Sequence, residues 1–193
     1  MNLKKLLFVP LFAAAFFSFK PVDKPVIVID AGHGGNDMGA VYETISEKQI
    51  TLKVASLIKE MSTSQDKYEI MLTRGDDSDV SLAERIEKIN RLNPKMVVSL
   101  HLNSSPEKES TKQGHEIYIQ NSDSSKKIAQ KVSEKLGQCP VQTKDLKILK
   151  ESKSPAVLVE MGFINSTKDR DYLNSDLGQK ETAQKFIEIF NEQ

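Results

Sequence analysis

The chain has 193 residues, in which 27 lysines and arginines balance 27 aspartates and glutamates, and it contains no tryptophan and one cysteine. This length suffices for one domain with its own hydrophobic core, and a single cysteine excludes an internal disulfide. Residues 1–20 hold three lysines and no acidic residue, so the remainder has a net charge of −3. That charge argues against a nucleic-acid partner, which would need a basic surface.

The first twenty residues have the pattern of a secretory signal. Lys4 and Lys5 form a basic head, and an almost uninterrupted apolar run extends from Leu6 to Phe19. The run is shorter than the roughly 20 apolar residues of a membrane span. We therefore expect residues 1–20 to be a signal peptide, residues 21–193 to form one folded domain, and the mature protein to be exported to the periplasm (cell-wall space). An uncleaved inner-membrane anchor is the alternative.

Short β-branched runs alternate with amphipathic segments beyond residue 25. Capping-box pairs mark two helix starts, at Ser46 with Gln49 and at Ser81 with Glu84. In chain order, the pattern predicts a strand at Val26–Asp30, a helix at Ser46–Met61, a strand at Tyr68–Thr73, a helix at Ser81–Leu92, strands at Lys95–His101 and Gly114–Gln120, a helix at Ser122–Leu136, a strand at Val157–Glu160 and a helix at Gly178–Phe190.

Strands separated by helices indicate an α/β fold. We expect a single domain with a mainly parallel twisted sheet of about six strands and helices on both faces. Two segments are less regular. Ser104–Gln113 is polar and predicts a mobile loop. Within Gln138–Glu151, residues Lys147–Lys150 are a candidate for a short strand.

Three apolar strands each end at a residue that can bind a metal or transfer a proton. The first leads into His33, which stands in a glycine-rich turn, and the others end at His101 and Glu160. Functional sites of open α/β sheets form at the carboxyl ends of the strands. These residues should therefore lie at one edge of the predicted sheet.

A catalytic zinc site needs three protein ligands and an open position for water. His33 and His101 are two candidates, and Glu47 is the third because its helix should begin beside the same sheet edge. Glu160 can then serve as the carboxylate that accepts a proton from water and delivers it to a leaving amine. Each residue also has a purely structural interpretation. His33 can be a turn residue, His101 can be a core histidine with all its hydrogen bonds made, and Glu47 can interact with the helix dipole.

Other catalytic motifs do not fit the chain. Asp37 interrupts a dinucleotide-binding glycine pattern, no Gly-Lys-Ser/Thr follows the glycines, and no nucleophile elbow is present. Cys139 has no histidine near it in the sequence, so a thiol enzyme is not expected. His115 is expected at the surface.

Six segments together resemble a known family, in its order and near its spacing. They are Val28–Ala40, Ser46–Leu52, Thr73–Asp77, Ser81–Arg85, Val97–Asn103 and Pro155–Ile164. The chain resembles the zinc-dependent N-acetylmuramoyl-L-alanine amidases of the Amidase_3 type over roughly residues 26 to 190. Alanine at position 31 and leucine at position 102 depart from the family's common residues, but neither departure removes a candidate ligand.

The resemblance implies that residues 21–193 are an amidase catalytic domain acting on peptidoglycan. His33, Glu47 and His101 would bind one zinc ion, and Glu160 would be the catalytic carboxylate. The reaction would hydrolyse the amide between N-acetylmuramic acid and L-alanine of the stem peptide, as in cell-wall degradation during cell separation. Arg74 and Arg85 would brace the fold, and Asn103 is a candidate to line the cleft.

Some family members cover the zinc with a helical insertion that an activator displaces. Only Leu102–Gln113 separates His101 from the next predicted strand, which leaves no room for such a lid. We expect a monomer that needs no dedicated activator. Two other functions stay open: hydrolysis of a different amide on the same scaffold, and wall binding without catalysis.

Overall fold

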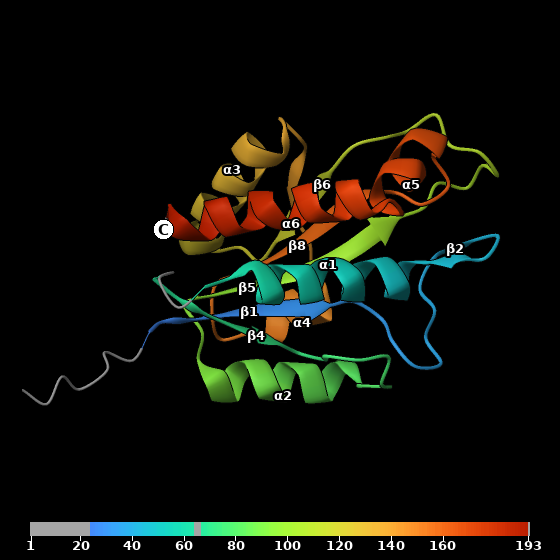
Figure 1. The fold of residues 1–193 in the computed structure, drawn as a ribbon. Helices are drawn as coiled ribbons and strands as arrows, with labels where there is room; N and C mark the ends of the chain where they lie inside the picture. The colour runs from blue at the N-terminus through green and yellow to red at the C-terminus, as the bar shows by residue number, and fades with distance from the viewer. Residues whose placement is uncertain (1–23, 64–66, 193) are drawn as a thin grey trace, which may run out of the picture.

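The computed structural model describes residues 24–63 and 67–192. The expected signal peptide lies outside these described residues. No helix within them is long and apolar enough to span a bilayer. The described part of the chain forms a three-layer α/β arrangement in which helices cover both faces of a central sheet (Figure 1).

The main sheet has six strands in the order β4-β1-β5-β8-β6-β7. The strands β4, β1, β5 and β8 are parallel, β6 runs antiparallel to β8, and β7 runs parallel to β6. A separate hairpin of β2 and β3 precedes the first helix. The bounds are β1 Val26–Ala31, β2 Val41–Tyr42, β3 Ile45–Ser46, β4 Glu69–Leu72, β5 Met96–Asn103, β6 Glu116–Ile119, β7 Val141–Thr143 and β8 Ala156–Phe163.

Six helices complete the described fold. They are α1 Glu47–Met61, α2 Leu82–Leu92, α3 Asp123–Leu136, α4 Lys147–Glu151, α5 Thr167–Leu173 and α6 Asp176–Asn191. Capping boxes are present at Ser46 and Ser81, so the predicted starts of α1 and α2 are confirmed. The apolar faces of α1, α3 and α6 pack on one side of the sheet, and the shorter α2 and α4 pack on the other (Figure 1).

Alternation along the strands divides the core in two. On β1, Ile27 and Ile29 join the large cluster under α1 and α6, whereas Val28 joins a smaller cluster with Ile86 and Ile89 of α2. The same alternation places Asp30, Ser99, His101 and Glu160 on the side of α2 and α4. This face carries only two short helices, so its carboxyl edge is left available for a site.

The predicted fold class is confirmed: one α/β domain with a mainly parallel six-stranded sheet. The suggested strand at Lys147–Lys150 is wrong, because these residues begin helix α4. Ile148 and Leu149 are adjacent and both buried, which one face of a helical turn permits and an alternating strand does not. The strand of this region is β7, whose three residues are all exposed and therefore carry no apolar pattern.

The Ser104–Gln113 segment contains no helix and no strand, as expected of a loop, and side chains outside it hold it at several points. Asn165 donates hydrogen bonds to the backbone carbonyls of Ser105 (3.0 Å) and Glu107 (2.6 Å). Thr167 donates to the Glu109 carboxylate at 3.1 Å. These contacts bind the loop to the segment that follows β8. Its mobility stays a prediction.

Candidate metal centre

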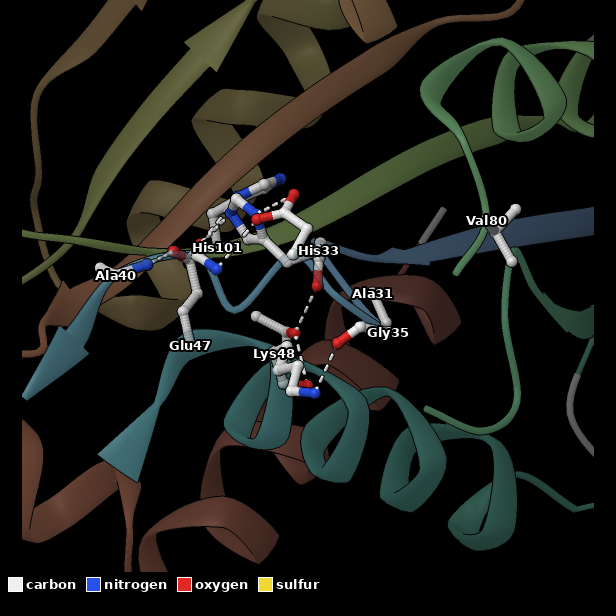
Figure 2. A network of polar contacts seen from close by, with 12 residues as sticks. Ala31, His33, Gly35, Ala40, Glu47, Lys48, Val80 and His101 are labelled. Carbon is white, nitrogen blue, oxygen red and sulfur yellow. Dashed lines mark hydrogen bonds and ion pairs between the residues drawn. The ribbon is translucent and has the colours of Figure 1, made fainter. Parts of the chain in front are cut away.

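Three of the residues singled out from the sequence meet at the carboxyl edge of the sheet. Glu47 Oε1 lies 3.0 Å from His33 Nε2 and 2.8 Å from His101 Nδ1. One ligand atom of each residue lies within 4.8 Å of the other two. Figure 2 shows Glu47 extending from the start of α1 toward the two imidazoles. Two imidazole nitrogens and a carboxylate oxygen are a donor set that zinc favours.

The backbone fixes both oxygens of Glu47. Oε1 accepts the Leu102 N–H at 2.9 Å, and Oε2 accepts the Ala40 N–H at 2.8 Å. The residue is only 3% exposed. Burial alone would raise the pKa of Glu47, but hydrogen bonds from His101 and His33 outweigh it and hold that pKa far below its usual range. Glu47 is therefore an ionised carboxylate, and backbone N–H groups orient both of its oxygens.

His33 is oriented by its own loop. Its backbone has φ of 61°, an uncommon conformation for a residue with a side chain. Its Nδ1 lies 2.8 Å from Asp37 Oδ2, which leaves Nε2 directed at Glu47. Burial lowers the pKa of His33, but Glu47 and Asp37 raise it more, to about 9 without a metal. A carboxylate behind a ligand histidine is the usual partner in zinc sites.

Two glycines make room for these rings. A Cβ on Gly39 would lie 2.5 Å from Glu47 Oε2 and 2.7 Å from His33 Cδ2. A Cβ on Gly32 would lie 2.5 Å from His101 Cε1. Any side chain at these positions would displace a candidate ligand. The glycines of the opening motif therefore shape the centre.

Two buried arginines brace the backbone that carries His33. Arg74 donates from Nε to the Ala31 carbonyl and from Nη2 to the Gly32 carbonyl, both at 2.9 Å. Arg85 pairs with Asp30 at 2.9 Å and also donates to the Ala31 and His33 carbonyls. The expectation that Arg74 and Arg85 brace the fold is confirmed.

Glu160 stands beside the three residues and is not part of their group. It lies on β8, where its Cα partner on β5 is His101 and its partner on β6 is Glu116. Its Oε2 is buried and has no hydrogen-bond partner within the described residues. Burial raises the pKa of Glu160 to about 7, while the charges of His101 and Lys144 oppose that rise. An unpartnered carboxyl that titrates near neutral pH suits proton transfer.

The sequence did not single out the surroundings of Glu160. Glu116 accepts hydrogen bonds from Asn103 Nδ2 at 2.9 Å and from the Tyr118 hydroxyl at 2.5 Å. The alternation of Glu116 and Tyr118 on one face of β6 was the available signal. His115 is half-buried and bonds to the Met161 carbonyl at 2.9 Å, so it lies outside this centre and is not the surface residue expected.

A pocket of about 250 Å³ opens on the other side of the centre. His33 and His101 line it together with Asp79, from the segment before α2, and Leu82, the first residue of α2. A substrate therefore has room beside the histidines on the side of β1 and α2.

Comparison with known proteins identifies the family. Residues 27–191 match the family model of N-acetylmuramoyl-L-alanine amidase, Amidase_3. The chain is 30% identical over 177 residues to the uncharacterized protein YqiI of Bacillus subtilis, covering 87% of this chain and 84% of that protein. It is also 30% identical to the amidase LytC of Bacillus subtilis, covering 85% of this chain and 34% of LytC. It thus spans most of YqiI and about a third of LytC.

Solved structures agree with this assignment. The catalytic domain of CwlV, an N-acetylmuramoyl-L-alanine amidase from Bacillus (Paenibacillus) polymyxa, is 31% identical, with a TM-score of 0.81 over 87% of this chain and 97% of that one. The N-acetylmuramoyl-L-alanine amidase from Clostridium difficile 630 is 26% identical, with a TM-score of 0.81 over 87% of this chain and 95% of that one. The chain belongs to the N-acetylmuramoyl-L-alanine amidase family, Amidase_3.

Proposed function

We propose that the protein is a zinc-dependent N-acetylmuramoyl-L-alanine amidase that hydrolyses peptidoglycan. The observation that carries this proposal is the convergence of His33, Glu47 and His101 within 4.8 Å, beside a buried and unpartnered carboxyl oxygen of Glu160. The family match supports the choice of bond, because relatives such as LytC bear that activity in their names. The bond broken is the amide that joins N-acetylmuramic acid to L-alanine.

The residues present suit a zinc ion. His33 Nε2, Glu47 Oε1 and His101 Nδ1 would hold it, and three protein ligands are what a catalytic zinc site requires. When bound, zinc supplies Lewis-acid chemistry that polarises the amide carbonyl and makes an attacking water more acidic. Asp37 keeps His33 in the tautomer that leaves Nε2 free to bind.

Glu160 carries the proton. Its carboxylate accepts a proton from the attacking water and then donates it to the nitrogen of L-alanine as the carbon–nitrogen bond breaks. The products are the carboxylate of the muramic acid lactyl group and a free α-amine on the stem peptide. No side chain becomes covalently attached to substrate. A carboxyl with a pKa of about 7 is suited to both transfers.

We further propose that residues 1–20 direct export to the cell-wall space and that the mature chain acts as a monomer without an activator. No helix lies between His101 and Glu116 in the described part of the chain. A related amidase, CwlD of Clostridioides difficile, has been solved in complex with the GerS lipoprotein. The purified mature chain should therefore be tested alone. Inertness until another protein is added would contradict independence from an activator.

The decisive experiment measures zinc content together with dye release from labelled sacculi. The native protein should hold about one zinc and release dye, with N-acetylmuramic acid and free L-alanine amines as the new ends. Glu160→Gln should keep its zinc and release no dye. Glu87→Gln, at an exposed helix position, is the matched control and should behave as native. A different bond cleaved by the native protein would overturn the proposed substrate, and zinc loss in Glu160→Gln would overturn the division of roles.

A further inference from the structure

The order of the strands gives the candidate site two different sides along the sheet. His33 follows β1, His101 lies on β5 and Glu160 on β8, and the next strand along the sheet is β6 with Glu116. His33 and His101 therefore lie on the β1 side of Glu160, and β6 and β7 lie on its other side. The two halves of a substrate that crosses this edge meet different surroundings.

The proposed function decides which half lies on which side, so the present inference rests on it. Glu160 must come within hydrogen-bond distance of the leaving nitrogen in order to protonate it. The leaving amine and its peptide therefore extend over β6 and β7. The acyl half of the substrate, which carries the sugar, therefore occupies the pocket beside His33, which Asp79 and Leu82 line.

An exposed lysine stands on the β6–β7 side. Lys144 directly follows β7, and its backbone N–H bonds to Ile119, at the end of β6 opposite Glu116. Its side chain extends back along β6, where Nζ lies 3.5 Å from the centre of the Tyr118 ring. The Tyr118 hydroxyl is bonded to Glu116 at 2.5 Å, which fixes the ring under the ammonium. A cation over an aromatic face is held by electrostatic attraction. Among residues 24–63 and 67–192, no carboxylate forms an ion pair with Lys144, so its charge is available to a ligand.

The chemistry of the leaving group fits this ammonium. A stem peptide carries free carboxylates beyond its first residue, and the carboxylates of Glu116 and Glu160 would repel them. A cation on the same side offsets that repulsion and offers an ion pair. We propose that Lys144 binds a carboxylate of the stem peptide and thereby favours acidic over amidated peptides. The competing role is electrostatic balance of Glu116 and Glu160 without contact with substrate.

Two synthetic ligands separate these roles. One is N-acetylmuramoyl-L-alanyl-D-glutamic acid, and the other is the same compound with both glutamate carboxyls amidated. Each is titrated calorimetrically against the zinc-loaded full chain carrying Glu160→Gln, which prevents turnover during the measurement. The acid should bind about two- to fivefold more tightly than the diamide, the range of an exposed ion pair. Adding Lys144→Met should bring this ratio to about one, and Lys144→Arg should retain it.

Lys150→Met, an exposed lysine of α4, is the matched control and should keep the native ratio. Equal affinities in the parent protein, no measurable binding of the acid, or a ratio unchanged by Lys144→Met would overturn the Lys144 subsite. The proposed function is assessed separately, because it fails if the native chain releases no N-acetylmuramic acid from the acidic ligand and creates no L-alanine amines in sacculi. Either proposal can thus fail while the other stands.

Discussion

Arg85 and Asp30 form a buried ion pair beneath the turn that carries His33. Arg85 Nη1 lies 2.9 Å from Asp30 Oδ1, and the two residues are 5% and 2% exposed. Ser99 and Thr73 each donate to the same carboxylate at 2.6 Å. The pair joins α2 to the end of β1 across 55 positions of sequence. It connects the stability of the fold with the conformation of a candidate metal ligand.

Arg85→Met should therefore be strongly destabilising. The substitution leaves the Asp30 charge buried without its cation and frees the Ala31 and His33 carbonyls, so the free energy of unfolding should fall by about 3–5 kcal/mol. Urea unfolding of the metal-free protein measures this change. Arg91→Met on the same helix removes an exposed pair at 4.0 Å and should cost less than about 0.5 kcal/mol. Similar losses for both variants would contradict the role given to Arg85.

Stability should also fall at acidic pH through Asp30. Burial by itself would raise the pKa of Asp30, but Arg85, Ser99 and Thr73 outweigh burial, so the folded-state pKa lies below the ordinary value of an aspartate. A carboxyl with a lowered folded-state pKa stabilises the fold above its unfolded pKa, and this contribution is lost as the pH falls through the folded-state value.

Asp30→Asn tests the pH effect. The difference in unfolding free energy between the native protein and this variant should be largest near pH 6 and should narrow below about pH 4, where Asp30 in the unfolded chain becomes protonated. Asp123→Asn, at an exposed helix start, should show no comparable narrowing. A difference that stays constant from pH 6 to pH 3 would show that the charge of Asp30 is not the cause.

Gly39→Ala should damage the metal centre more than the fold. The added Cβ would lie 2.5 Å from Glu47 Oε2, and φ of +64° at this position is strained for alanine. We expect at least about a tenfold loss of zinc affinity, measured by chelator competition, because Glu47 and His33 must both shift. At Gly75, nothing lies within 4 Å of an added Cβ, so Gly75→Ala should bind zinc as the native protein does. Unchanged affinity in Gly39→Ala would contradict the close fit around Glu47.

Asp37→Asn should weaken zinc binding without unfolding the protein. The Asp37 side chain is 64% exposed, so its removal has little effect on the core, yet it holds His33 Nδ1 at 2.8 Å. Loss of such an orienting carboxylate typically lowers metal affinity about 10- to 100-fold. Thermal unfolding of the metal-free variant should match that of the native protein. Asp171→Asn, whose side chain is 71% exposed, is the control and should leave both quantities unchanged.

Residue patterns were enough to predict the fold class and the places of the principal strands, although β5 and β8 continue past His101 and Glu160 to Asn103 and Phe163. Buried parallel strands are apolar runs, and their carboxyl ends share one edge of a sheet, so His33, His101 and Glu160 could be expected near one another. The place of Glu47 could be predicted because the capping box of Ser46 and Gln49 marks the start of its helix. These features depend on periodicity and on short-range backbone preferences, which a single sequence carries.

Which strands are neighbours, and what surrounds each side chain, depends on contacts between distant parts of the chain. Glu116 stands beside Glu160 because β6 pairs antiparallel with β8, and no local pattern encodes that pairing. Lys144 reaches Tyr118 because β7, a strand with no buried residue, adds to β6. Strand order and long-range contacts depend on how the whole chain packs. For that reason, only the folded molecule shows which residues lie on each side of Glu160.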